Sequence, residues 1–357
     1  MELYVDIQKR FEGFNLNVKF NTNGHILGLL GESGSGKSMT LRCIAGLITP
    51  DSGRIVLNGR VLFDSYKGIN MPIRKRKVGF LFQNYALFPN MNVEQNIGYA
   101  LNKLPKKERK VIIDECIEMM HIEDLRKRYP NELSGGQQQR AALARALAVK
   151  PEALFLDEPF SALDNHLRNI MVKQMWDTLS VYDGVTVFVT HNLEEAYQLC
   201  SKLVILSEGH EEGIGLKEDI FNNPPTVTAA KITGCKNISK AERKQDGKVA
   251  AADWKCTLSG INTEGNKITH IGIRAHYLRL ASDRDSNSIL CWPAYVSEMP
   301  FRKLVFLKLS EQPKSKSDYE LMWDISNEEW EEIKQIPIPW KVCISPEKII
   351  LINDCAY

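Results

Sequence analysis

The sequence predicts an α/β domain followed by a smaller all-β domain. In the first part of the 357-residue chain, short apolar runs alternate with helical patterns. Near Asn222-Asn223-Pro224-Pro225 this alternation stops. Strand-like segments dominate after that point, and five of the six tryptophans lie there. We therefore expect one domain over residues 1–235 and a second over 236–357.

Four apolar runs predict the strands of the first domain: Ile26–Leu30, Ala153–Leu156, Val185–Val189 and Leu203–Leu206. Runs of this length are typical of parallel strands buried on both faces. A polar or Gly-rich turn follows each run, and a helical pattern follows most, which predicts crossover helices. In the second domain, three segments predict the strands of a small barrel or pair of barrels: Ile268–Ile273, Leu304–Leu309 and Lys348–Ile352.

Composition excludes several classes of function. Hydrophobic residues at 43% and charged residues at 25% are ordinary for a soluble globular protein. A net charge of +2 provides no broad basic field for nucleic acid. The eight cysteines form no CxxC pair, which argues against zinc or disulfides and fits a reducing cytosol. The start of the sequence lacks signal-peptide features, and no apolar run approaches the roughly 20 residues of a membrane helix. Any role at a membrane is therefore expected to need a partner.

A phosphate-binding loop is predicted directly after Ile26–Leu30. The segment fits the pattern G-x-x-x-x-G-K-[ST], with Met39 next in the chain: Gly31, Glu32, Ser33, Gly34, Ser35, Gly36, Lys37 and Ser38. The glycines let successive N–H groups point at phosphate oxygens, and the helix that begins near Gly36 adds its positive dipole end. Lys37 is expected to reach the β- and γ-phosphates, and Ser38 to ligate Mg²⁺. A Gly-Ser turn without a ligand is the alternative.

Two carboxylates, Asp157 and Glu158, follow the run Ala153–Leu156 directly. Charges at the end of a buried strand are costly unless a cation or hydrogen bonds satisfy them. Asp157 suits a ligand of Mg²⁺, bound directly or through water. Glu158 is placed to polarise the attacking water in phosphoryl transfer. An ordinary strand-end salt bridge is the simpler alternative.

The segment Leu133-Ser134-Gly135-Gly136-Gln137 narrows the class of P-loop protein. Its serine and glycines expose N–H groups at the start of a helix through Ala141–Ala148, which makes a second anion cradle. With Gln138-Gln139-Arg140 after it, the segment resembles the LSGGQ signature of the ABC transporter ATPase family. The resemblance implies an ABC-type P-loop NTPase fold and a head-to-tail homodimer, in which this cradle closes on ATP held by the other copy. A serine N-cap with a Gly turn is the alternative without a ligand.

Other segments resemble further elements of the family, in the expected order. Gln83 matches the Q-loop glutamine, which contacts Mg²⁺ and water. Ser161-Ala162-Leu163-Asp164 matches the D-loop, which crosses the dimer interface and places Asp164 among the nucleotide-binding residues. His191 matches the switch histidine, and it follows a strand at the edge where parallel sheets bind ligands. The resemblance thus implies Glu158, His191 and Gln83 as catalytic residues. It also implies an aromatic residue on adenine, for which Phe11 and Phe14 are both candidates.

A single cassette without a fused membrane segment resembles the ATPases of multi-subunit importers. This implies permease subunits that hold the ATPase at the cytoplasmic face of the cell membrane, and indirectly a substrate-binding protein. The segment Tyr85-Ala86-Leu87-Phe88-Pro89 resembles the apolar patch, within Gln83–Pro89, that receives the permease. Burial of these aromatic residues in the core is one alternative. A soluble ABC nucleotide switch without a transport role is the alternative from another functional class.

The C-terminal domain resembles the OB-like (TOBE-type) accessory domain of importers for oxyanions, iron and sugars. The chain is similar to the sulfate and molybdate importer ATPases, and Gly53–Asp64, with Lys67-Gly68-Ile69, resembles the molybdate group in particular. Molybdate or a related oxyanion is therefore the expected cargo, with sulfate, ferric iron or a sugar as alternatives. For the domain itself two roles stay open. It is either a platform that keeps two cassettes close or a regulatory anion site, with Lys236, Ser239 and Arg274 as donors.

Overall fold

The computed structural model describes residues 1–24, 26–161, 163–263, 267–283 and 285–354. Contacts divide the chain into two compact units, Met1–Lys217 and Glu218–Tyr357. The division lies earlier than the boundary expected between 235 and 236. The reason is that Ala230 and Cys235 pack in one cluster with Ile350 and Ile352, so the residues before 236 already contribute to the C-terminal core.

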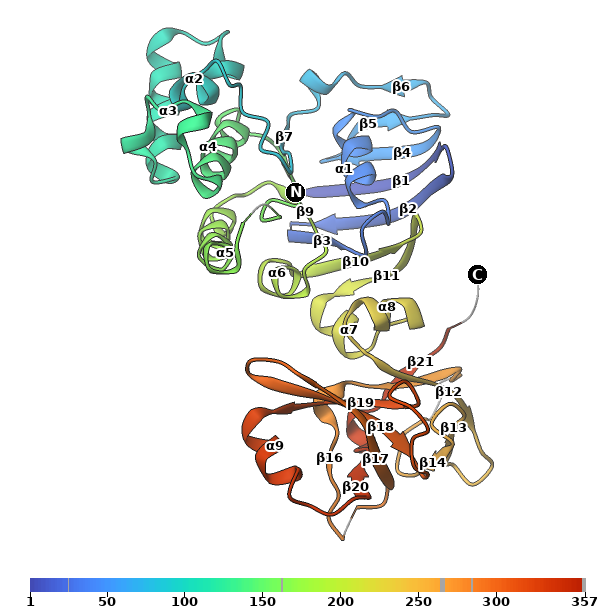
Figure 1. Cartoon of the computed structure of the whole chain (residues 1–357). Coiled ribbons are helices and arrows are strands. Elements are labelled where there is room, and N and C mark those ends of the chain that lie inside the picture. The colour runs from blue at the N-terminus through green and yellow to red at the C-terminus, as the bar shows by residue number, and fades with distance from the viewer. Residues whose placement is uncertain (25, 162, 264–266, 284, 355–357) are drawn as a thin grey trace. The chain divides into compact units, whose positions relative to one another are not determined.

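The N-terminal unit contains an 11-stranded sheet, in the order β6-β5-β4-β1-β2-β11-β10-β3-β9-β8-β7 (Figure 1). The strands are β1 (Glu2–Phe11), β2 (Phe14–Asn23), β3 (Ile26–Leu30), β4 (Ser52–Leu57), β5 (Arg60–Asp64), β6 (Ile69–Asn70), β7 (Val78–Leu81), β8 (Ala153–Asp157), β9 (Val185–Thr190), β10 (Lys202–Ser207) and β11 (His210–Leu216). All four apolar runs are strands, and β10, β3, β9 and β8 pair in parallel. The predicted α/β fold class is confirmed.

The sequence analysis missed the antiparallel half of this sheet. β1 and β2 pair over their whole length, from Glu2 opposite Asn23 to Phe11 opposite Phe14. Leu3, Val5 and Ile7 are buried and alternate with more exposed residues. This period-two pattern is the signal of a strand with one buried face. It was readable from the sequence, because β2 repeats the same alternation.

Six helices of the N-terminal unit are described: α1 (Lys37–Ala45), α2 (Val93–Gly98), α3 (Lys106–Met119), α4 (Gly135–Ala148), α5 (Asn165–Ser180) and α6 (Leu193–Leu199). In Figure 1, α2, α3 and α4 form a helical group beside β7, whereas α5 and α6 lie close to the parallel strands. α1 contacts β8 and β9 and carries Leu41, Cys43 and Ile44 into the core. The phosphate loop and the carboxyl ends of the parallel strands are thus held by a buried apolar layer.

The C-terminal unit contains two five-stranded sheets, in the orders β14-β13-β12-β15-β21 and β16-β20-β17-β18-β19. Its elements are α7 (Lys217–Asn222), α8 (Val227–Ile232), β12 (Asn237–Arg243), β13 (Val249–Ala251), β14 (Cys256–Leu258), β15 (His270–Ile273), β16 (Arg279–Leu280), β17 (Ser288–Glu298), β18 (Arg302–Leu309), β19 (Leu321–Ser326), α9 (Asn327–Ile333), β20 (Trp340–Cys343) and β21 (Ile350–Ile352). One core joins the two sheets and includes Trp254, Trp323 and Trp340. The predicted smaller all-β domain is therefore confirmed, with α7, α8 and α9 as added helices.

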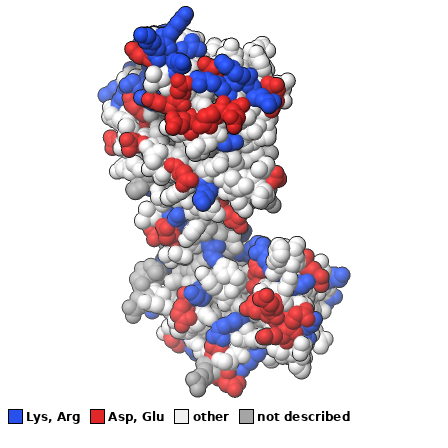
Figure 2. Space-filling model, turned by 90° about the vertical axis from the view of Figure 1, so that its left-hand side faces the viewer, with Lys and Arg blue, Asp and Glu red and all other residues white. Residues whose placement is uncertain are grey.

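No helix in the described part of the chain is long and apolar enough to cross a membrane. Figure 2 shows the face of the molecule that carries the helical group of the N-terminal unit. Lys and Arg gather at its upper end, and a band of Asp and Glu lies directly below. Charges of opposite sign are thus neighbours on this face, so their fields partly cancel at a distance.

Candidate functional site

The phosphate loop joins β3 to α1, and its shape requires glycine. Gly34 and Gly36 have φ angles of 84° and 102°, a region that other residues rarely adopt. At Gly31, an added Cβ would lie 2.1 Å from the carbonyl oxygen of Leu206. The loop therefore forms a narrow cradle of backbone at the amino end of α1, as a phosphate group requires.

Lys37 lies at the centre of this loop and is 4% exposed. Its Nζ donates to the carbonyl oxygens of Gly31, at 2.9 Å, and Glu32, at 2.7 Å. Burial lowers the pKa of Lys37, and the nearby carboxylates of Glu158 and Asp157 oppose that shift. A desolvated ammonium group held by weak neutral acceptors is free to exchange them for phosphate oxygens, so the loop fits ATP.

Ser38 and Asp157 meet although they lie on different elements. The Ser38 hydroxyl donates to Asp157 Oδ1 at 2.6 Å, and Arg42 Nη2 lies 3.9 Å from Asp157 Oδ2. Hydroxyl and carboxylate oxygens are ligands that suit Mg²⁺. The described residues include no group of three or more His, Cys, Asp or Glu that could hold a metal ion. The two side chains thus fit an ion that takes its remaining ligands from phosphate and water.

Glu158 is the point where the expected catalytic residues converge. Its Oε2 lies 3.3 Å from His191 Nδ1 and 3.5 Å from Gln83 Nε2. Its φ of 44° places it in the left-handed region, a strain that is typical of functional sites. An open cleft of about 540 Å³ adjoins this group and is lined by Arg42, Phe82, Gln83, Asn84 and Ser161. The site can therefore admit a solvent molecule beside a carboxylate.

The signature segment begins α4. Ser134 is the N-cap: its Oγ accepts from the Gln137 N–H at 3.4 Å, while Gln137 Oε1 accepts from the Ser134 N–H at 2.9 Å. Both residues are outside the core, and Gly135 follows the cap. Among the described residues, no hydrogen bond links this segment to the phosphate loop. Within one chain, the two anion cradles are thus separate surfaces.

Asp164, the last residue of the expected D-loop, is the N-cap of α5. Its Oδ1 accepts from the Leu167 N–H at 3.0 Å. Ala162 of the same loop lies outside the described residues. Met39, at the other end of the expected nucleotide contacts, is partly buried against the core. The described part of the D-loop thus runs from the end of β8 into the first turn of α5.

Only part of the expected permease patch is exposed. Tyr85 is 4% exposed and its hydroxyl donates to the Pro159 carbonyl oxygen at 3.4 Å, so it belongs to the interior. Phe88 is half-buried and stacks with Tyr99 at 4.4 Å between ring centroids. Arg145 of α4, which no motif indicated, donates to the carbonyl oxygens of Tyr85 and Ala86 at 2.9 and 2.7 Å. The helical group therefore fixes the backbone of this loop.

Phe11 and Phe14 lie at the turn between β1 and β2, with ring centroids 6.1 Å apart. Both are partly buried. A Cβ added to Gly36 would lie 3.0 Å from the Phe14 ring, which places that ring against the phosphate loop. Either ring remains a candidate for adenine.

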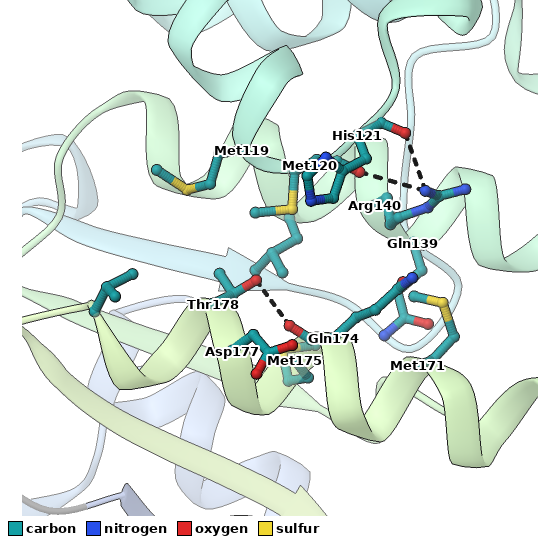
Figure 3. Close-up of a pocket in the computed structure, with 12 residues that line it drawn as sticks. Met119, Met120, His121, Gln139, Arg140, Met171, Gln174, Met175, Asp177 and Thr178 are labelled. Atoms are coloured by element: carbon teal, nitrogen blue, oxygen red, sulfur yellow. Dashed lines mark hydrogen bonds between the residues drawn. The ribbon is translucent and has the colours of Figure 1, made fainter.

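A separate cavity of about 160 Å³ lies between α3, α4 and α5 (Figure 3). Its lining includes four methionines, Met119, Met120, Met171 and Met175, together with the amide side chains of Gln139 and Gln174. Gln139 is 0% exposed, and neither of its amide atoms has a hydrogen-bond partner in the described part of the chain. None of the expected nucleotide residues lines this cavity, so it is not the nucleotide site.

A profile of the ABC transporter family matches residues 14–161. The chain is 41% identical over 242 residues to a probable sulfate/thiosulfate import ATP-binding protein of Chlorella vulgaris, covering 66% of this chain and 99% of the relative. The chain belongs to the ABC transporter ATP-binding family. As a member of this family it is an ATPase.

Two further relatives differ in cargo. This ABC ATPase is 33% identical to a sulfate/thiosulfate import ATP-binding protein of Nitrosomonas europaea, over 98% of this chain and 97% of the relative. It is 42% identical to a spermidine/putrescine import ATP-binding protein of Oleidesulfovibrio alaskensis, over 72% of this chain and 67% of the relative.

A solved structure of an ATP-binding cassette, described as a dimeric post-hydrolysis state with ADP and Pi, is similar to the nucleotide-binding unit of this ABC ATPase. The TM-score is 0.52 at 27% identity, and the match covers 60% of this chain and 98% of that one. The fold of the ABC cassette is thereby confirmed, and so is ATP as its nucleotide.

The Asp157 carboxyl of this ABC ATPase predicts a pH-dependent stability. Burial raises its pKa, although the Ser38 hydroxyl and Arg42 act in the opposite direction. Ionisation therefore destabilises the fold as the pH rises above about 3.9, the usual pKa of Asp. We expect Asp157→Asn, which keeps an acceptor for Ser38, to raise the free energy of unfolding without nucleotide by about 1 kcal/mol at pH 7.

Urea denaturation at a series of pH values measures this effect. The gain is expected to shrink as the pH falls toward the raised pKa of Asp157, because the wild-type carboxyl then becomes protonated. Asp164→Asn is the matched control, because Asp164 is exposed and asparagine is an equally good N-cap. A gain for Asp157→Asn that is the same at all pH values would contradict the assignment to ionisation.

Proposed function

We propose that this ABC ATPase powers the import of sulfate or a related oxyanion through a membrane permease. The observation that carries the proposal is the similarity to the Nitrosomonas europaea sulfate/thiosulfate importer, because it extends through both units of the chain. The alignments to the Chlorella vulgaris and Oleidesulfovibrio alaskensis relatives cover only 66% and 72% of this chain. The nucleotide-binding part acts on ATP whatever the cargo.

The proposed nucleotide site is divided between two copies of the chain. One copy supplies the phosphate loop Gly31–Ser38, with Mg²⁺ held by Ser38, Asp157 and Gln83. The same copy supplies Glu158 to orient the attacking water and His191 to contact the γ-phosphate. The second copy supplies Ser134–Gln137 and Asp164. The similarity to a dimeric cassette supports this arrangement, and so does the exposure of Ser134, the first residue of the Ser134–Gln137 segment, in a single copy.

The proposed permease contact is the Gln83–Pro89 region, reduced to its exposed part. Ala86 and Pro89 are exposed, while Leu87 and Phe88 are half-buried. Because Gln83 belongs to this segment and contacts Glu158, a permease that moves the segment would move a catalytic residue. Held in this way, the ATPase would lie peripherally at the cytoplasmic face of the membrane, with a substrate-binding protein acting on the other side of the permease.

The comparisons favour sulfate over the molybdate that the segments Gly53–Asp64 and Lys67–Ile69 led us to expect. Uptake of labelled sulfate, molybdate and spermidine by cells that express the wild-type chain or Lys37→Ala tests the proposal. We expect the Lys37 variant to lose sulfate uptake and to retain spermidine uptake. Loss of spermidine uptake alone in the Lys37→Ala cells would contradict the oxyanion assignment. Uptake of all three compounds that is equal in wild-type and Lys37→Ala cells would contradict a transport role.

For the C-terminal unit, the contacts favour the platform over the anion site. Arg274 donates to the backbone carbonyl oxygens of Thr233 and Phe221, and Ser239 is buried with its hydroxyl donating to the Lys240 carbonyl. Two of the three proposed donors are thus already engaged, and the third, Lys236, is exposed. We propose that this unit stabilises the dimer, and we expect ATP hydrolysis by the permease complex to be unchanged by added sulfate, molybdate or tungstate. Inhibition by one of these anions would restore the regulatory role.

A further inference from the structure

Glu195 is a buried carboxylate that belongs to none of the motifs above. It lies in the first turn of α6 and is 6% exposed. Burial raises its pKa, while Thr190 and Arg168 oppose that shift. A carboxylate is retained in such a place only when its partners compensate the loss of water. Those partners lie on β9 and α5.

The first partner is Thr190, the last residue of β9. Its hydroxyl donates to Glu195 Oε2 at 2.6 Å and accepts from the Asn192 N–H at 3.0 Å. These two bonds bracket His191, which lies between Thr190 and Asn192 in the chain. The position of the His191 ring, 3.3 Å from Glu158, therefore depends on a turn that Glu195 holds.

The second partner is Arg168, in the first turn of α5. Its Nε lies 3.5 Å from Glu195 Oε1, and its Nη2 donates to the carbonyl oxygen of Leu163 at 3.1 Å. Leu163 belongs to the D-loop. One guanidinium group thus contacts both the D-loop backbone and the carboxylate that holds the turn of His191.

We propose that Glu195 is a positioning residue that couples the D-loop to the switch histidine. A contiguous series of contacts runs from Leu163 through Arg168, Glu195 and Thr190 to the turn of His191. When a second copy of the chain displaces the D-loop, the displacement reaches His191 through the contacts of Glu195 with Arg168 and Thr190. The inference rests on the roles proposed above for the D-loop and His191. A coupling of this kind is established by measured energetic coupling, not by proximity alone.

Glu195→Gln tests the proposal, because the amide keeps an acceptor for Thr190 and removes the charge that Arg168 faces. We expect kcat for ATP hydrolysis to fall about tenfold while the Kd for ATP changes less than twofold. We also expect the dependence of the rate on ATP concentration to lose its cooperativity. Thr190→Val should show the same pattern, Thr190→Ser should retain wild-type values, and the double variant should be no worse than either single one.

Glu152→Gln is the matched control for loss of a partly buried ion pair. Glu152 lies directly before β8, and its Oε2 is 2.9 Å from Arg60 Nη2. The Glu152→Gln variant should have a lower free energy of unfolding, while its ATP hydrolysis should keep the wild-type cooperativity. Wild-type kcat and cooperativity in Glu195→Gln would overturn the inference. An equal loss of kcat and cooperativity in Glu152→Gln would overturn it too. His191→Ala separates failure of the proposed role of His191 from failure of the coupling through Glu195. If that variant hydrolyses ATP normally, the proposed role of His191 fails. If it is inactive while Glu195→Gln is normal, only the coupling fails.

Discussion

Glu158→Gln is expected to lower kcat for ATP hydrolysis by roughly 10²- to 10³-fold, the usual contribution of a general base. The Kd for ATP should change less than about twofold, because the side-chain contacts of Glu158 are with His191 and Gln83, and it acts on Lys37 of the phosphate loop only through its charge. Glutamine has nearly the same shape and keeps an acceptor for the Gln83 amide. Single-turnover hydrolysis and equilibrium binding measure the two quantities separately.

The same variant should accumulate as a closed dimer when ATP is present. Binding is intact but the step that opens the dimer is blocked, so size-exclusion chromatography with ATP should show the dimer for Glu158→Gln alone. Glu108→Gln is a suitable control, since Glu108 is exposed on α3. Turnover within a fewfold of wild type in Glu158→Gln would remove this residue from the catalytic role.

Ser134→Arg is expected to abolish hydrolysis although Ser134 forms no hydrogen bond with the phosphate loop of its own chain. An arginine at the start of α4 would fill the second anion cradle and prevent the partner's ATP from entering it. Loss of the N-cap itself costs only about 1 kcal/mol of stability. Steady-state hydrolysis tests the effect, and Ser134→Thr, which retains a capping hydroxyl, should remain active.

Mixing Ser134→Arg with Lys37→Ala tests whether the site is composite. Each variant alone should be inactive. An equal mixture should recover at most about a quarter of wild-type activity, because about half of the dimers are mixed and each of those has one intact site. Normal hydrolysis by Ser134→Arg as a monomer would show that the site lies within one chain and would rule out the divided arrangement.

The parts of the site that local backbone chemistry dictates were predictable from the sequence. The phosphate loop needs glycine where φ is positive, and the signature needs a capping serine before its glycines. Such requirements leave a pattern in consecutive residues, so the two anion cradles could be placed before any tertiary contact was known. The parallel strands were predictable for a similar reason, because burial on both faces leaves an unbroken apolar run.

Non-local packing accounts for two other differences between the expectations and the structure. Tyr85 is indistinguishable in the sequence from its exposed neighbours, yet the Pro159 carbonyl and α4 enclose it. The N-terminal unit ends earlier than expected for the same kind of reason, because Ala230 packs against Ile350 and Ile352 from the far end of the chain. Neither contact has a signal in the adjacent sequence.

The sequence by itself identified an ABC-type ATPase, and it placed a Gly-rich loop after one strand and two carboxylates at the end of another. Only the tertiary structure decided how those groups meet. Ser38 reaches Asp157 across 119 positions of the chain, and Gln83 and His191 converge on one oxygen of Glu158. The physical reason is the strand order β3-β9-β8-β7, which differs from chain order and brings distant carboxyl ends to one edge of the sheet. Glu195 could be recognised only there, because its importance lies in the buried partners that the sheet and α5 bring to it.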